Sequence, residues 1–114
     1  MLTVELLKEY GANTAEGISR CVNNEQFYLR MVKKVSADPN FEALESAIKA
    51  HDLNKAFEAA HAIKGITGNL SLDPILLPVK EITEWLRNGE DRDYAPYVEL
   101  IMEKKRELDK ICAD

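Results

Sequence analysis

Apolar residues recur at three- and four-residue steps along most of the chain, the spacing that places side chains on one face of an α-helix. No stretch of four to eight residues alternates convincingly between apolar and polar positions, as a half-buried strand would. The stripes of apolar residues after position 24 are, in chain order, Tyr28-Met31-Val32-Val35, Phe41-Leu44-Ile48, Ala56-Ala59-Ile63-Ile66-Leu70, Ile75-Val79-Ile82-Leu86 and Tyr94-Tyr97-Ile101-Leu108-Ile111. The pattern therefore predicts an all-α protein.

Residues that start and stop helices separate these stripes. Asp52 is a good N-cap for the segment that follows it, and Asp73-Pro74 combines an acidic N-cap with a proline in the first turn. Asp38-Pro39 supplies a break or a kink, and the stripe that follows Asp73-Pro74 stops at Asn88-Gly89. Pro78 lacks the N–H that a helix uses at its fifth position, so we expect an irregular first turn there.

The N-terminal residues predict shorter elements. Gly11-Ala12-Asn13 ends a short amphipathic piece, and Asn13 with Glu16 forms a capping pair for another short turn of helix. The four main helical segments after them predict an antiparallel four-helix bundle with a short extra N-terminal helix. At 114 residues the chain has room for one core, so we expect residues 1–114 to form a single domain.

Composition and charge narrow the function classes. The chain is 46% hydrophobic and 31% charged, as in an ordinary globular domain. No apolar stretch is long enough for a membrane span or a signal peptide, so we expect a cytoplasmic protein with no membrane partner. The net charge of −5 argues against nucleic acid as a partner, because that requires clustered Lys and Arg. Glutamates flank the basic run Lys104-Lys105-Arg106, which we interpret as a solvated helix face.

Several kinds of site lack the residues they need. Cys21 and Cys112 have no CxxC spacing and are interpreted as reduced thiols. A metal site would need three or four converging ligands, and His51 lies about 80° away from His61 on a helical wheel, so no metal is expected. No nucleotide-binding glycine loop and no recognisable nucleophile triad occurs, so no cofactor and no kinase machinery is expected.

The segment AAHAIKGITGNL, Ala59 to Leu70, carries the candidate chemistry. With ~100° per residue, the apolar stripe of this helix falls within ~40° of the direction opposite to His61; it consists of Ala56, Ala59, Ile63, Ile66 and Leu70. The imidazole should therefore face water. Within ~60° of His61 lie, among others, Asn54, Phe57, Lys64, Gly65, Gly68 and Leu72.

The residue types on this face suit phosphoryl chemistry and close docking. An exposed histidine with an ordinary pKa near 6.5 is mostly neutral at pH 7 and offers a ring-nitrogen lone pair as nucleophile. Lys64, one turn later, can offset the negative charge of an arriving phosphoryl group. Gly65 and Gly68 clear side chains from the surface beside His61, although glycine costs a helix roughly 0.5–1 kcal/mol relative to alanine. With Phe57 one turn before the histidine, the face predicts a phosphoryl acceptor that docks another protein.

The run His61-Ala62-Ile63-Lys64-Gly65, continued by Gly68-Asn69-Leu70, resembles the HxxKG signature of histidine-containing phosphotransfer (HPt) domains. The likeness covers most of the chain. It implies a four-helix bundle that carries a phosphoryl group on His61 between aspartates of receiver domains in a multistep phosphorelay. Lys64 would steady the phosphoryl oxygens, and Gly65 would give the receiver room to approach. Ile66-Thr67 stands where the family usually has small residues, and Pro78 is also unusual for it.

The partners that the resemblance implies are response-regulator receiver domains and a hybrid sensor histidine kinase. The protein is then a monomeric phosphoryl carrier and not an enzyme. The alternative is a helical interaction module, an adaptor that kept the bundle and lost the chemistry. Because such a descendant would be expected to lose His61 or Lys64 first, the presence of both favours the carrier. The N-terminal MLTVELLKEY, with its own initiator methionine, favours a free-standing protein.

Overall fold

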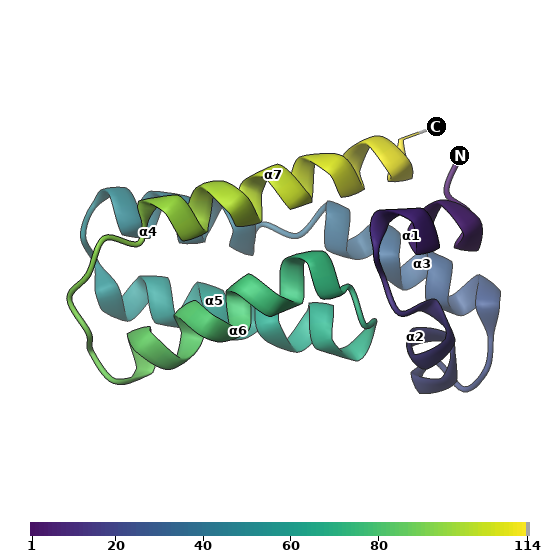
Figure 1. The fold of residues 1–114 in the computed structure, drawn as a ribbon, viewed down its shortest axis with the longest axis horizontal. Helices are drawn as coiled ribbons and strands as arrows, with labels where there is room; N and C mark the ends of the chain where they lie inside the picture. The colour runs from purple at the N-terminus through teal and green to yellow at the C-terminus, as the bar shows by residue number, and fades with distance from the viewer. Residues whose placement is uncertain (114) are drawn as a thin grey trace.

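The computed structural model describes residues 1–113 and gives them as seven helices (Figure 1). In chain order these are α1 (Val4–Tyr10), α2 (Thr14–Arg20), α3 (Glu25–Ser36), α4 (Asn40–Lys49), α5 (Leu53–Asn69), α6 (Asp73–Arg87) and α7 (Ala95–Cys112). No strand occurs within residues 1–113, so the predicted all-α class is confirmed.

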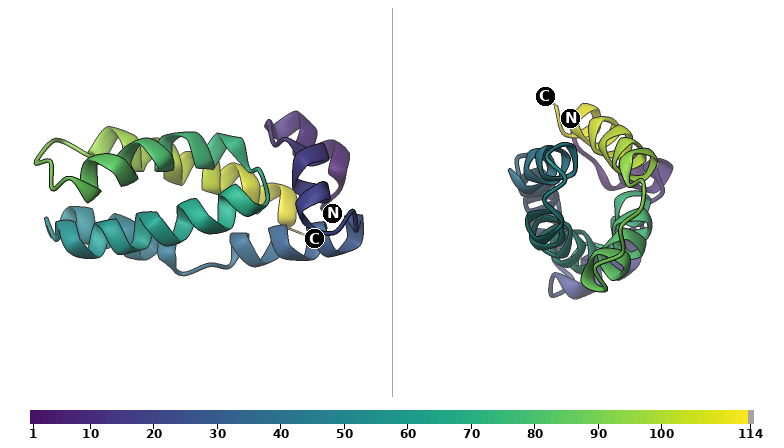
Figure 2. Two further views of the ribbon diagram at one scale, coloured as in Figure 1. Left: turned by 90° about the horizontal axis from the view of Figure 1, so that it is seen from below. Right: turned by 90° about the vertical axis from the view of Figure 1, so that its left-hand side faces the viewer.

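The helices α4 to α7 form the bundle. Each of them packs against the next one in the chain, and α7 also contacts α4, which closes the ring. Figures 1 and 2 show these helices side by side along the long axis of a molecule that measures 40 × 25 × 20 Å. Short connections between consecutive helices reverse the chain direction, so the predicted antiparallel four-helix bundle is also confirmed.

The helices α1, α2 and α3 extend the molecule at one end of the bundle (Figure 1). Gly11 ends α1 in a left-handed conformation, φ 111°, which glycine adopts without strain. Asn13 caps α2 by accepting a hydrogen bond from the Glu16 N–H, as the sequence predicts. The Tyr10 hydroxyl donates to the Lys104 carbonyl at 2.8 Å and ties α1 to α7. The N-terminal region thus contains two short helices and is fastened to the bundle.

Gly17 lets α2 lie directly against the end of α5. A Cβ at Gly17 would stand 2.6 Å from the Leu70 carbonyl oxygen and would also collide with the ring of Tyr28. The Tyr28 side chain is fully buried, and its hydroxyl donates to the same Leu70 carbonyl at 3.0 Å. This position therefore requires glycine because two other segments occupy the space of a side chain.

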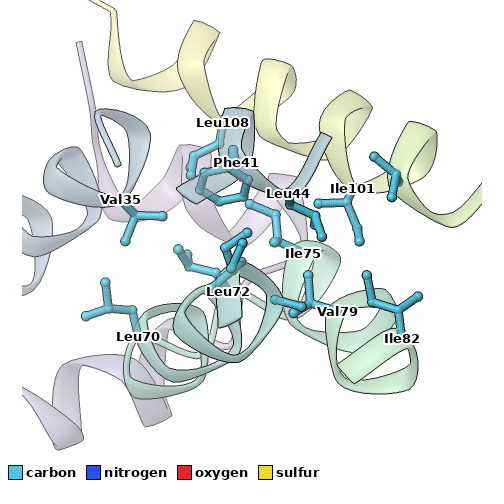
Figure 3. Close-up of a cluster of buried hydrophobic side chains, with 14 of the residues drawn as sticks. Val35, Phe41, Leu44, Leu70, Leu72, Ile75, Val79, Ile82, Ile101 and Leu108 are labelled. Carbon is cyan, nitrogen blue, oxygen red and sulfur yellow. The ribbon is translucent and has the colours of Figure 1, made fainter. Parts of the chain in front are cut away.

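The core of the bundle consists of the predicted apolar stripes. Figure 3 shows side chains from α4, α6 and α7 converging with those of the turn after α5. The labelled residues are Val35, Phe41, Leu44, Leu70, Leu72, Ile75, Val79, Ile82, Ile101 and Leu108, all of which are buried. Burial of these faces against each other is what holds amphipathic helices in a bundle.

Two details near α6 differ from the sequence prediction. The helix includes Asp73, so its N-cap is Leu72 and has no side-chain hydrogen bond. Pro78 lies inside a continuous helix and not in an irregular turn. The helix tolerates it because the residue four positions earlier, Pro74, belongs to the first turn, so a single carbonyl near the helix end loses its partner.

The end of α5 also corrects the helical wheel. The wheel extended the helix to Leu72 and placed that residue on the water-facing side. The helix ends at Asn69, and Ser71 then takes a positive φ of 53° that turns the chain. Leu72 is consequently fully buried.

Candidate functional site

His61 lies near the middle of α5 with its side chain exposed to solvent. The Asp52 side chain caps this helix by accepting from the Lys55 N–H at 3.1 Å, as the sequence predicts. Ala56, Ala59 and Ile63 are buried on the side of α5 that faces the bundle. The packing of that stripe fixes the rotation of the helix, and this rotation turns the imidazole outward.

Phe57 stacks on the imidazole one turn before it. The ring centroids of Phe57 and His61 are 5.7 Å apart, and the ring planes differ by 18°. The Arg87 guanidinium carbon on α6 lies 5.2 Å from the centroid of the same phenyl ring. Phe57 is half-buried and packs against the core, whereas the sequence placed it on the water-facing surface as part of the docking face. The wheel of α5 alone missed this because α6 covers that side of the helix.

Lys64 reaches from α5 toward α6. Its Nζ lies 3.9 Å from the Glu84 Oε1, and the Arg87 Nε lies 3.5 Å from that same oxygen. Lys64 is half-buried, while Glu84 and Arg87 are exposed. The site therefore contains a carboxylate between two cations, one turn away from the histidine. Glu84 and Arg87 could not be predicted from the sequence, because they follow His61 by more than twenty residues and no local motif marks them.

The two glycines have different surroundings. Gly65 is exposed, and a Cβ added there would meet no atom within 4 Å among residues 1–113, apart from its chain neighbours and the adjoining backbone of α5. Gly68 is half-buried, and its Cβ would lie 3.7 Å from the Leu76 Cδ1 on α6. Gly65 thus leaves open surface beside His61, whereas Gly68 is also part of the contact between α5 and α6.

The residues between the glycines do not obstruct this face. Thr67 is fully buried and donates its hydroxyl to the Ile63 carbonyl at 2.7 Å. Ile66 is half-buried and packs against the core, on the coreward side that the wheel predicts. The side chains at these two positions therefore pack toward the interior and do not obstruct the surface around His61.

The other candidate residues lie away from this site. His51 follows the end of α4, where its Nε2 is 3.6 Å from the Asp91 Oδ1. No group of three or more metal-ligating side chains occurs in the described part of the chain. Cys21 and Cys112 are free thiols, and burial, with the nearby Asp109 carboxylate, raises the pKa of Cys112.

The basic run of α7 forms ion pairs along its own helix. The Lys104 Nζ is 3.1 Å from the Glu107 Oε2, and the Lys105 Nζ is 2.8 Å from the Asp109 Oδ1. Lys105 is more buried than a solvated face would be, since its ammonium also lies 5.3 Å from the centroid of the Phe41 ring. The interpretation as paired charges therefore agrees with the structure, and Lys105 also packs against the ring of Phe41.

Fold and site together define a helical bundle that presents a histidine and a nearby cation on one open face. The model of the Hpt domain family matches residues 31–114, which is 84 of the 114 residues. The chain belongs to the Hpt domain family, whose members are the phosphotransfer modules of two-component phosphorelays. The match contains all of α4 to α7 and leaves α1 and α2 outside.

The remaining comparisons add two findings. No curated protein and no solved structure gave a significant match to this chain. Among the helices of residues 1–113, none combines the length and the apolar character that a membrane crossing demands.

Proposed function

We propose that this protein is a phosphorelay carrier that accepts a phosphoryl group on His61 from the aspartate of one receiver domain and passes it to the aspartate of another. The observation that carries the proposal is the placement of His61, which is exposed on α5, stacked on Phe57 and one helical turn from Lys64. Family membership supplies the class of reaction, and these residues supply a place for it.

The transfer needs only a nucleophile, a leaving group and charge stabilisation. The lone pair of a His61 ring nitrogen forms the new N–P bond. The P–O bond to the receiver's aspartate breaks, and its electron pair returns to that carboxylate. The other ring nitrogen keeps its hydrogen, so no base of this chain has to remove a proton during the transfer. Phe57, stacked on the imidazole, restricts the orientation of the ring before the receiver arrives.

Lys64 supplies the charge stabilisation in this proposal. Negative charge is spread over the phosphoryl oxygens during transfer, and a positioned ammonium can offset it. Lys64 is one turn from His61, and its weak contact with Glu84 at 3.9 Å leaves it able to turn toward the phosphoryl group. No nucleotide is required, because the receiver's acyl phosphate brings the phosphoryl group already activated.

The docking surface that we propose for the receiver includes Gly65, Gly68 and the exposed edge of Phe57. The open space at Gly65 supports close approach of a partner beside the imidazole. A buried cluster that draws on α1 and on α3 to α7, with Ile18 of α2 packed against it, supports one domain over residues 1–113, which presents this surface. The monomeric state, the hybrid kinase as a donor and the cytoplasmic location stay predictions.

The two histidines of the chain provide a matched test. We expect His61→Gln to abolish labelling by a receiver domain phosphorylated with ³²P, because glutamine has no nucleophilic ring nitrogen. His51→Gln should be labelled like the parent, since His51 lies at the α4–α5 turn. The label should be acid-labile and base-stable, as a phosphoramidate is. Labelling of His61→Gln at the parent's level would refute the assignment, and a parent that binds receivers without accepting label would establish the adaptor alternative.

A further inference from the structure

The carboxylate of Glu84 pairs with Lys64, the cation that the proposed chemistry needs. We propose that Glu84 is the resting counter-ion of Lys64, and that it competes with the phosphoryl group on His61 for this ammonium. The inference rests on the proposed function. It assigns a role to a residue of α6 that is outside the HxxKG signature on α5.

The ion pair has the geometry of a contact that opens easily. The Lys64 Nζ and Glu84 Oε1 are 3.9 Å apart, beyond the 2.7–2.9 Å of a charge-assisted hydrogen bond. The side chain of Glu84 is 57% exposed, so water competes for it. Within the same protein, Lys105 is 12% exposed and holds both carboxylate oxygens of Asp109, at 2.8 and 2.9 Å. Lys105 therefore forms a structural pair, whereas Lys64 forms a loose one.

Arg87 gives Glu84 a second partner when Lys64 leaves. The Arg87 Nε is 3.5 Å from the same Oε1 that faces Lys64. A phosphoryl group carries between one and two negative charges and presents three acceptor oxygens, whereas Glu84 carries one charge. Lys64 should accordingly turn from Glu84 to the phosphoryl group once His61 is modified, while Arg87 keeps the carboxylate paired. After transfer to the next aspartate, Lys64 returns to Glu84.

This exchange limits how strongly the bundle holds a phosphoryl group. Lys64 must give up one partner to gain the other, so the affinity of the site for phosphate is lower than that of a free lysine beside the histidine. For an exposed pair of this kind the difference corresponds to about a 1.5-fold to fivefold change in an equilibrium constant. A carrier benefits from this, because it has to release the group to an acceptor as well as accept it.

In the first test, inorganic phosphate is titrated into the protein. Binding is monitored through the NMR signals of the Lys64 ε-methylene and the His61 ring. We expect Glu84→Gln to bind phosphate about 1.5-fold to fivefold more tightly than Glu81→Gln does. Glu81 is a matched control: it is exposed on α6, it loses the same charge, and it takes part in none of the ion pairs found within residues 1–113. Equal affinities in the two variants would overturn the proposal.

The second test separates competition for Lys64 from direct repulsion of phosphate by the carboxylate. In a Lys64→Ala background, adding Glu84→Gln should no longer improve phosphate binding, because the ammonium that Glu84 occupies is absent. An undiminished gain in that background would mean that Glu84 acts by repulsion, and the proposal would be wrong.

Labelling by the small donor phosphoramidate keeps this inference distinguishable from the proposed function. The rate for Glu84→Gln should exceed that for Glu81→Gln by a similar factor. If His61 takes no label although Glu84→Gln still improves phosphate binding, the proposed function fails while the pairing of Glu84 with Lys64 stands. If the parent is labelled and the two variants have equal phosphate affinities, the inference about Glu84 fails alone.

Discussion

Gly65→Gln should separate docking from chemistry. The residue lies one helical turn after His61 and ~40° from it around α5, so an added side chain would stand beside the imidazole. The structure offers open space there, since a Cβ at Gly65 meets nothing within 4 Å among residues 1–113 beyond its chain neighbours and the adjoining backbone of α5. The first atom of an added side chain therefore meets no obstacle within the protein, so the expected interference is with a docking partner.

The expected gain in stability and the expected loss of transfer rate both follow from this geometry. Replacing glycine in the interior of a helix by a residue with good helix propensity stabilises the fold by about 0.5–1 kcal/mol, because the unfolded chain loses freedom. For a domain of this size this corresponds to an increase in Tm of about 2–6 °C. If the glutamine side chain displaces the receiver by about 1 Å, transfer should slow by about a hundredfold.

The assay compares two phosphodonors and one control variant. Gly65→Gln should keep most of its reactivity toward phosphoramidate, which needs no docking surface, and lose most of its reactivity toward a phosphorylated receiver. Ala43→Gln adds the same side chain at an exposed position of α4 and should leave both reactions unchanged. Equal loss with both donors would place Gly65 in the chemistry, and no loss with either would refute the docking surface.

Two further predictions concern Lys64 and Tyr28. Lys64→Ala should slow transfer by roughly tenfold to a thousandfold, because a positioned ammonium can offset transition-state charge. The circular dichroism spectrum should be unchanged, because a partly exposed lysine stabilises the fold little. An unaltered rate would make Lys64 an ordinary surface residue. Burial raises the pKa of Tyr28 to about 12, above its ordinary value of 10.0, so its stabilising contribution is complete below pH 10 and is lost as the pH rises toward 12. Urea unfolding at a series of pH values should show this loss, of about 2–3 kcal/mol, reduced in Tyr28→Phe; an equally steep loss in the variant would contradict the assignment.

The sequence by itself determined the helices and the outward direction of His61. Both depend on the 3.6-residue period, which relates residues within one helix and can be read without knowing its neighbours. The stripe from Ala56 to Ile63 is buried and His61 is exposed, as the wheel predicts. Capping by Asp52 and Asn13 could also be predicted from the sequence, because a cap bonds to an N–H only three residues away.

Only the tertiary structure decided what surrounds the histidine. Phe57 is half-buried and Leu72 is fully buried because α6 packs beside α5 and the chain turns at Ser71, neither of which appears in a wheel of α5. The carboxylate of Glu84 reaches Lys64 for the same reason, since antiparallel packing brings together residues twenty positions apart. Local periodicity fixes which side of a helix is apolar, but the polar residues that meet across two helices depend on how the helices pack against each other.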